Sequence, residues 1–301
     1  MRILGQTSPI TSAYFSIGGR RLMEVQQTAP RLIEVMGPPG VGKSTTLKAL
    51  FGDPAVSEHY MDRFVSEKQL QYLGYAQEKT AFDRGSYRQA FELVFNILAE
   101  SDLRVSRRVF ALDMCRETLL TRYKLENGAA NSLGERHIVH DELTLHRALS
   151  VLPFSRCKER DAREYFRVAP VPDKLIICLA APETIAERAL TRGGLINGYQ
   201  DYPTEDLPVL ISELTDCCFI AAEELSQRGV AIGFAHLDGE LESSMSSIRE
   251  HLPLASIQHA DSKPRKKSWL TSILSSALCP AMELATGEAI QNGLPAALLL
   301  A

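Results

Sequence analysis

The chain has 301 residues, of which 33 are Lys or Arg and 37 are Asp or Glu, so its formal net charge is −4 at pH 7. Hydrophobic residues make up 45% of the chain, which is enough to build one or two globular domains without disulfide or metal support. The slight acidic excess argues against a protein that mainly grips nucleic acid, because binding to phosphates requires a basic excess or a basic stripe. We therefore expect no nucleic-acid partner.

The cysteines and the apolar runs indicate the compartment. The six cysteines form no C-x-x-C pair and no zinc-like spacing with histidine, so we expect reduced and mostly buried thiols. Residues 1–19 contain no apolar run typical of a secretory signal. No stretch reaches the roughly 18 consecutive apolar residues that a membrane-spanning helix requires. The sequence thus predicts a cytoplasmic protein.

Three parts of the chain differ in their hydrophobic pattern. Residues 1–30 have weak periodicity, and we expect an N-terminal extension with one strand near residues 13–17. Residues 31–254 alternate short apolar runs with helical spacing, which predicts one folded domain with a helical insert at about residues 54–130. Residues 255–301 are expected to form a basic linker and an amphipathic tail.

The first half of the domain begins with a strand over residues 31–36, a glycine-rich loop and a helix over residues 43–51. Apolar residues then recur at intervals of three and four, which predicts two helices in the insert, over residues 86–101 and 105–127. The second helix is expected to end at Asn127 and Gly128, since both residues favour helix ends.

The second half of the domain alternates strands with helices. We expect three strands, over residues 137–140, 174–180 and 230–234. We expect three helices, which are a short one that ends at Leu149, one that begins at Pro182 and a long one at about residues 205–228. Strands that alternate with helices predict a three-layer α/β fold with a parallel sheet.

A glycine-rich loop provides the most specific motif. It fits G-x-x-x-x-G-K-S/T between a strand and a helix, through the residues Gly37, Pro38, Pro39, Gly40, Val41, Gly42, Lys43 and Ser44. Glycines let successive backbone N–H groups turn toward a phosphate, and the helix N-terminus adds partial positive charge. The motif predicts that residues 37–45, Thr45 included, bind ATP, that Lys43 reaches the β and γ oxygens, and that the Ser44 hydroxyl is a ligand of Mg²⁺. The alternative is a glycine turn that caps a helix, with Lys43 on the surface.

An acidic pair follows the predicted strand over residues 137–140. A carboxylate at the end of such a strand would reach Mg²⁺ through water, and we expect Asp141 to do so. Glu142 is a candidate for orienting the attacking nucleophile. The alternative is that Asp141 caps the following helix and Glu142 is a solvated acid in its first turn.

Two arginines, Arg188 and Arg192, are spaced i, i+4 on one helix face just past a strand. Two guanidinium groups at this place could clamp a transferring phosphoryl group, whose charge is spread over its equatorial oxygens. The alternative is an exposed helix face on which these arginines pair with Glu183 or Glu187.

These motifs occur in an order that resembles the nucleoside-monophosphate kinase group, and the thymidylate-kinase and deoxynucleoside-kinase branches are most similar. The set is the glycine loop, the strand that ends in Asp141 and Glu142, the strand over residues 174–180 with its arginine helix, and the last strand closing on residues 237–239. The resemblance implies a P-loop NTPase fold, arginines in a lid over the phosphates, and a loop after the last strand beside the adenine. In that group the acidic strand usually continues with arginine, whereas Glu142 stands here.

We therefore expect a Mg²⁺- and ATP-dependent kinase that phosphorylates a small acceptor such as a nucleotide or nucleoside. Its catalytic candidates are Lys43, Asp141, Glu142, Arg188 and Arg192. Asp62 is a further candidate for orienting the acceptor hydroxyl. Several charged residues of the insert are candidates for holding an anionic acceptor, namely Asp62, Arg63, Asp83, Arg84, Arg88, Arg107, Arg108 and Arg116. The alternative for each of them is a place on the solvated face of an amphipathic helix.

Two other functions remain as alternatives. One is a regulatory P-loop ATPase, in which Glu142 would polarise water. The other is peripheral membrane contact through residues 263–278, because a basic cluster there precedes an amphipathic segment that bears the only tryptophan, Trp269. A tail helix that packs on the domain would explain the same pattern.

Overall fold

The computed structural model of the protein describes residues 31–70, 85–132, 136–191 and 202–253. All of these ranges belong to one compact unit that ends at Pro253. Four predictions fall outside the described residues, and these are the N-terminal extension with its strand near residues 13–17, the acceptor candidates Asp83 and Arg84, the phosphate clamp Arg192, and the basic linker and tail over residues 255–301.

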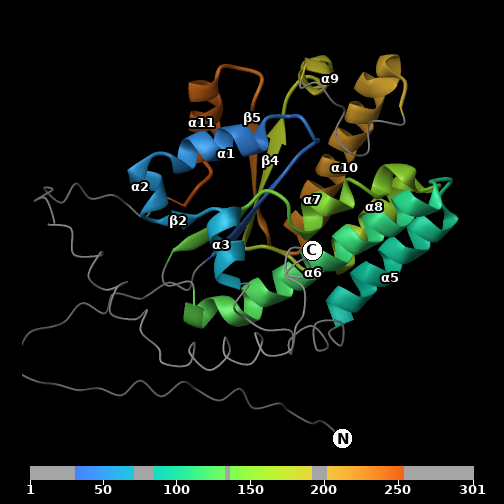
Figure 1. Cartoon of the computed structure of the whole chain (residues 1–301), viewed down its shortest axis with the longest axis horizontal. Coiled ribbons are helices and arrows are strands. Elements are labelled where there is room, and N and C mark those ends of the chain that lie inside the picture. Colours follow the sequence, from blue (N-terminus) through green and yellow to red (C-terminus); the bar gives the residue numbers. More distant parts are fainter. Residues whose placement is uncertain (1–30, 71–84, 133–135, 192–201, 254–301) are drawn as a thin grey trace, which may run out of the picture. The chain divides into compact units, whose positions relative to one another are not determined.

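The described residues form one five-stranded sheet in the order β2-β3-β1-β4-β5, and every pairing is parallel (Figure 1). The strands are β1 (Leu32–Met36), β2 (Tyr60–Met61), β3 (His137–His140), β4 (Lys174–Leu179) and β5 (Ala231–His236). The predicted parallel α/β fold is therefore confirmed. Strand β2 was not predicted, because two residues are too few to show alternation.

The central strands are buried on both faces. All five residues of β1 are buried, and so are the four middle residues of β4. Continuous apolar runs are typical of strands that helices cover on both sides. Glu34 is the one polar residue in β1, and it is buried with no exposed surface.

Helices lie on both sides of the sheet. In Figure 1, α1 (Lys43–Phe51) and α11 (Leu241–Arg249) lie together on one side, and α8 (Lys158–Val168) and α10 (Leu207–Gln227) lie on the other. The sheet is thus the middle of three layers, as predicted. The remaining described helices and turns are α2 (Pro54–Ser57), α3 (Arg63–Leu70), α5 (Gly85–Glu100), α6 (Val105–Ser132), α7 (Thr144–Ala148), η2 (Leu152–Phe154), α9 (Pro182–Thr191) and η3 (Thr204–Asp206).

The two helices predicted over residues 86–101 and 105–127 are present as α5 and α6, but α6 is longer than predicted. Helices α5 and α6 pack against each other, α5 also packs on α8, and α6 packs on α7. The prediction that α6 ends at Asn127 and Gly128 is wrong, because the helix continues to Ser132. The Asn127 amide donates to the Tyr123 carbonyl one turn earlier, at 2.7 Å. Asparagine thus bonds within the helix here instead of ending it.

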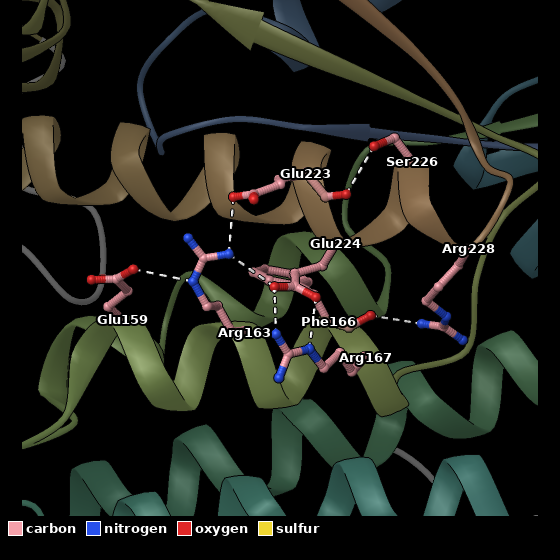
Figure 2. Close-up of polar contacts among 8 residues, drawn as sticks. All are labelled: Glu159, Arg163, Phe166, Arg167, Glu223, Glu224, Ser226 and Arg228. Atoms are coloured by element: carbon pink, nitrogen blue, oxygen red, sulfur yellow. Dashed lines mark hydrogen bonds and ion pairs between the residues drawn. The ribbon is translucent and has the colours of Figure 1, made fainter.

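Helix α8 was not predicted, and it packs on α10 through a charged contact (Figure 2). The buried carboxylate of Glu224 on α10 accepts hydrogen bonds from Arg167 Nε at 2.7 Å and from Arg163 Nη1 at 2.9 Å. The hydrogen bond from Arg167 lowers the pKa of Glu224. Arg228 donates to the carbonyls of Phe166 and Ala169 at the end of α8. The buried residues Ala162, Tyr165 and Phe166 of α8 lie at helical spacing, so apolar periodicity is present in this segment and could have identified the helix.

The prediction of mostly buried cysteines is confirmed where the structure describes the chain. The described cysteines are all free thiols, and each is buried except Cys157, which is exposed. Cys279 lies outside the described residues. Within the described ranges, every helix is too short or too polar to cross a lipid bilayer.

Candidate functional site

The glycine-rich loop connects β1 to α1 through a backbone that requires glycine. Gly37 has a φ of +154° and Gly42, the N-cap of α1, has a φ of +112°, both in a region that side chains strain. A Cβ atom on Gly37 would lie 2.4 Å from the carbonyl oxygen of Cys178 on β4. The loop can therefore leave the sheet this close to β4 only with glycine at position 37.

Lys43 lies inside the loop and not on the surface. Its side chain is buried, and Nζ donates hydrogen bonds to the carbonyls of Gly37 at 2.8 Å and Pro38 at 3.2 Å. Burial lowers the pKa of Lys43. An ammonium group has three N–H donors, so the third can reach a phosphate oxygen held by the same loop.

Ser44 and Asp141 lie together although 97 positions separate them in the sequence. The Ser44 hydroxyl donates to Asp141 Oδ2 at 2.6 Å. The sheet order explains the contact, because β1 leads into the glycine loop, β3 leads into Asp141, and the two strands are neighbours. The two residues that the sequence assigns to Mg²⁺ are thus adjacent.

The donor set at this point suits Mg²⁺. A hydroxyl and a carboxylate are hard oxygen ligands, and Mg²⁺ is usually held by one or two protein groups together with substrate phosphates and water. No group of three or more His, Cys, Asp or Glu that could hold a metal ion occurs among the described residues. Ser44 and Asp141 would therefore hold Mg²⁺ together with nucleotide phosphates and not in a cage made only of protein.

The alternative interpretation of the acidic pair is wrong. The N-cap of α7 is Leu143, so Asp141 does not cap that helix. Glu142 is not a solvated acid either, because it forms ion pairs with Arg63 and with Arg147, the latter at 2.6 Å. Arg63 also approaches Asp141 at 3.7 Å. The acidic pair is therefore held between two guanidinium groups.

Arg188 extends from α9 to the glycine loop. Its Nη1 donates to the Val41 carbonyl at 2.9 Å. Its partner in the predicted clamp, Arg192, lies outside the described residues. Arg188 thus lies against the loop that is predicted to bind phosphates.

A cavity of about 250 Å³ lies beside this contact, and we call it the Arg188 cavity. Thr45 and Thr46 at the start of α1 line one part of it, and Leu237 and Gly239 after β5 line another. The predicted place of the loop after the last strand, beside the nucleotide, is consistent with this arrangement. A cavity that reaches from the glycine loop to this segment has the position that a nucleotide base would need.

A second cavity of about 330 Å³ lies on the other side of Ser44 and Asp141, and we call it the Arg63 cavity. Its charged lining consists of Lys48, Asp62 and Arg63 in addition to Asp141. Its other lining residues are mostly apolar, and they are Leu47, Phe51, Phe64 and Val139. Arg63 Nε is buried and has no hydrogen-bond partner among the described residues. The cavity thus combines two cationic and two acidic side chains with an apolar wall.

Most other arginines of the insert do not reach the site. Arg88 pairs with Glu92 at 2.7 Å and Arg116 pairs with Glu117 at 2.6 Å, each on an exposed helix face. Arg108 donates to the Ala99 carbonyl at 3.3 Å, within the contact of α5 and α6. Arg63 enters the site because it follows β2, which pairs with β3.

Two cationic groups at the site were not among the predicted candidates. Arg147 holds Glu142, and Lys48 lines the Arg63 cavity one turn after Ser44. Glu34 is also linked to the site through α7, as described below. An acidic residue inside an otherwise apolar strand was the signal that could have identified Glu34.

Comparison with known proteins finds similarity in structure and not in sequence. No protein-family model matches the chain, and no curated protein matches it in sequence. Among solved structures, the chain is similar to thymidylate kinase from Candida albicans, with 14% sequence identity, a TM-score of 0.42, and coverage of 74% of this chain and 90% of that one. A likeness this distant says nothing about activity, and the fold described above rests on the strand order and the glycine loop.

Proposed function

We propose that this chain is a kinase that uses Mg²⁺ and ATP to phosphorylate a small acceptor, such as a nucleotide or nucleoside. The observation that carries the proposal is the hydrogen bond of 2.6 Å between Ser44 and Asp141, at a glycine loop that adjoins two cavities. A switch or a motor needs a nucleotide site, whereas a kinase also needs an acceptor site beside it. The Arg63 cavity provides a place for that acceptor.

On the donor side, the backbone N–H groups of the glycine loop and the Lys43 ammonium would bind the phosphates. The base would lie in the Arg188 cavity, against Leu237 and Gly239. Mg²⁺, held by Ser44 and through water by Asp141, would neutralise charge between the phosphates when bound. Arg188 would add positive charge at the side of the loop where it contacts Val41.

On the acceptor side, the chemistry of the Arg63 cavity indicates a molecule with an anionic group and an apolar or aromatic part. Arg63 and Lys48 would supply positive charge for the anionic group, because both line the cavity. Phe51 and Phe64 line the same cavity and would cover an apolar or aromatic part. Asp62 would orient the acceptor hydroxyl toward the donor phosphate.

The regulatory ATPase fits the contacts less well. In that function Glu142 would have to polarise a water molecule, yet its carboxylate is bound by Arg63 and Arg147. The membrane alternative depends on residues 263–278, which lie outside the described residues, and it stays a prediction.

Release of ADP by the full chain tests the proposal, measured with Mg²⁺ and ATP alone and then with panels of nucleosides, nucleoside monophosphates, sugars and lipids. We expect one acceptor class to accelerate ADP release. Arg63→Met should weaken that acceleration roughly tenfold, since a charge-assisted hydrogen bond contributes about 1.5–3 kcal/mol. Arg88→Met, on an exposed helix face, is the matched control and should change nothing. Slow ATP hydrolysis that no acceptor accelerates would refute the kinase and favour the ATPase.

A further inference from the structure

Glu34 is a buried acid in the strand that leads into the glycine loop. Its side chain has no exposed surface, and it is the only polar residue among the five of β1. The parallel register places it beside His140, the last residue of β3, so it lies one position before the level of Asp141. Burial of a carboxyl group costs free energy unless the group makes hydrogen bonds, so Glu34 needs hydrogen-bond partners inside the protein.

Those partners are backbone groups of α7. Glu34 Oε1 accepts hydrogen bonds from the backbone N–H of Leu145 at 2.7 Å and of His146 at 3.0 Å. The first N–H groups of a helix have no acceptor within the helix, so they need one from outside. Leu143, the N-cap of α7, makes no side-chain cap hydrogen bond. Glu34 therefore caps a helix that is 110 residues away in the sequence.

Helix α7 is in turn linked to both acids of the candidate site. It begins at Thr144, three residues after Asp141, and its Arg147 holds Glu142 at 2.6 Å. Asp141 accepts the Ser44 hydroxyl at 2.6 Å. Strand β1 thus supports the site in two ways, since it continues into the glycine loop and it fixes the start of α7 through Glu34.

We propose that Glu34 is a positioning residue, which fixes the first turn of α7 and thereby holds Asp141 at the distance from Ser44 that a shared Mg²⁺ requires. The inference rests on the proposed function insofar as it assigns Asp141 to the metal-nucleotide complex. What it adds is the part of the chain that sets the position of Asp141. This role requires an oxygen at the right distance from α7 and does not require a negative charge. The Oε1 atom of a neutral carboxyl or amide group can also accept both backbone hydrogen bonds.

Two variants separate reach from charge. Glu34→Gln removes the charge and keeps an oxygen at the same distance from the backbone of β1. Glu34→Asp keeps the charge but shortens the side chain by one methylene group, so its carboxylate lies farther from α7. The readout is the affinity of the full chain for ATP, measured by calorimetry with Mg²⁺ and with a chelator. The ratio of the two affinities reports the contribution of Mg²⁺, which a purely structural role would not change.

We expect Glu34→Gln to keep the wild-type ratio and Glu34→Asp to lower it about 10-fold to 100-fold, the usual effect of removing a group that orients a metal ligand. Affinity with the chelator should stay the same, because the glycine loop is unaltered. Glu224→Asp is the matched control, since it shortens another buried glutamate, which binds Arg163 and Arg167 between α8 and α10. A wild-type ratio in Glu34→Asp, or equal losses in both Glu34 variants, would overturn the positioning role.

Amide hydrogen exchange of Leu145 and His146 tests the contact without nucleotide. Free amides in the first turn of a helix exchange quickly, so protection in the wild type and in Glu34→Gln would report the bond to Glu34. Rapid exchange of both amides in the wild type would overturn the inference even if Glu34→Asp fails to fold. If the amides are protected but the wild type does not bind ATP, the proposed function and the role of Asp141 fail, while the cap on α7 stands.

Discussion

Gly37→Ala should damage both stability and nucleotide binding, because the new methyl group has no space. Met36 pairs with Ile177, so the next residue, Gly37, faces Cys178 on the neighbouring strand. An added Cβ would lie 2.4 Å from the Cys178 carbonyl oxygen and 3.3 Å from its Cβ atom. The contact is with backbone in the middle of the sheet, which cannot rotate aside as a flexible side chain would.

The size of the effect has two parts. A non-glycine residue in a sparsely populated backbone region costs about 1–3 kcal/mol, and overpacking of a filled core costs about 1–3 kcal/mol more. Gly229→Ala separates them, because Gly229 also has a positive φ, +81°, but nothing lies within 4 Å of its added Cβ. We therefore expect Gly37→Ala to be less stable than Gly229→Ala by about 2 kcal/mol, or about 4–8 °C in Tm for a domain of this size.

Thermal unfolding and ATP titration of the two variants form the assay. Gly37→Ala should lose measurable ATP binding because the loop must move away from β4, whereas Gly229→Ala should bind ATP as the wild type does. Equal Tm values for the two variants, or wild-type ATP affinity in Gly37→Ala, would refute the close approach of the loop to β4.

Two further predictions concern Glu34 and Arg188. Burial raises the pKa of Glu34 from 4.5 to about 7, so the folded state holds more protons than the unfolded state between these pH values, and stability falls as pH rises through this interval. Urea unfolding at pH 5 and pH 8 should show that the wild type loses about 2.5 kcal/mol relative to Glu34→Gln, whereas an equal pH dependence would contradict the raised pKa. Arg188→Ala should weaken ATP binding roughly tenfold, as expected from the loss of one charge-assisted hydrogen bond. Glu187→Ala, on the exposed face of the same helix, should leave ATP binding unchanged. Equal ATP affinities in the two variants would show that Arg188 does not act on the nucleotide.

The elements that the sequence predicts well are those that one local pattern dominates. Strands β1 and β4 are apolar apart from Glu34 and Lys174, and the glycine loop is defined by residue type and spacing alone. These features require no knowledge of distant contacts. They were sufficient to predict a parallel α/β fold around a phosphate-binding loop.

The features that escaped prediction depend on contacts between distant segments. Helix α8 packs on α10 through ion pairs of Arg163 and Arg167 with Glu224, a partner that its own sequence does not identify. Arg63 joins Glu142 only because β2 lies beside β3, an order that no local pattern reveals. The cap that Glu34 provides for α7 is of the same kind, since a buried acid in a strand signals a partner without identifying it.

The fate of the γ-phosphate tests the central claim most directly. The full chain would be incubated with Mg²⁺ and ATP labelled at the γ-phosphate, together with the acceptor class that accelerates ADP release. Our account predicts that the label appears on the acceptor, and that Asp141→Asn abolishes the transfer. Label that appears only as inorganic phosphate, at the same rate with and without acceptor, would contradict the assignment of this protein as a kinase.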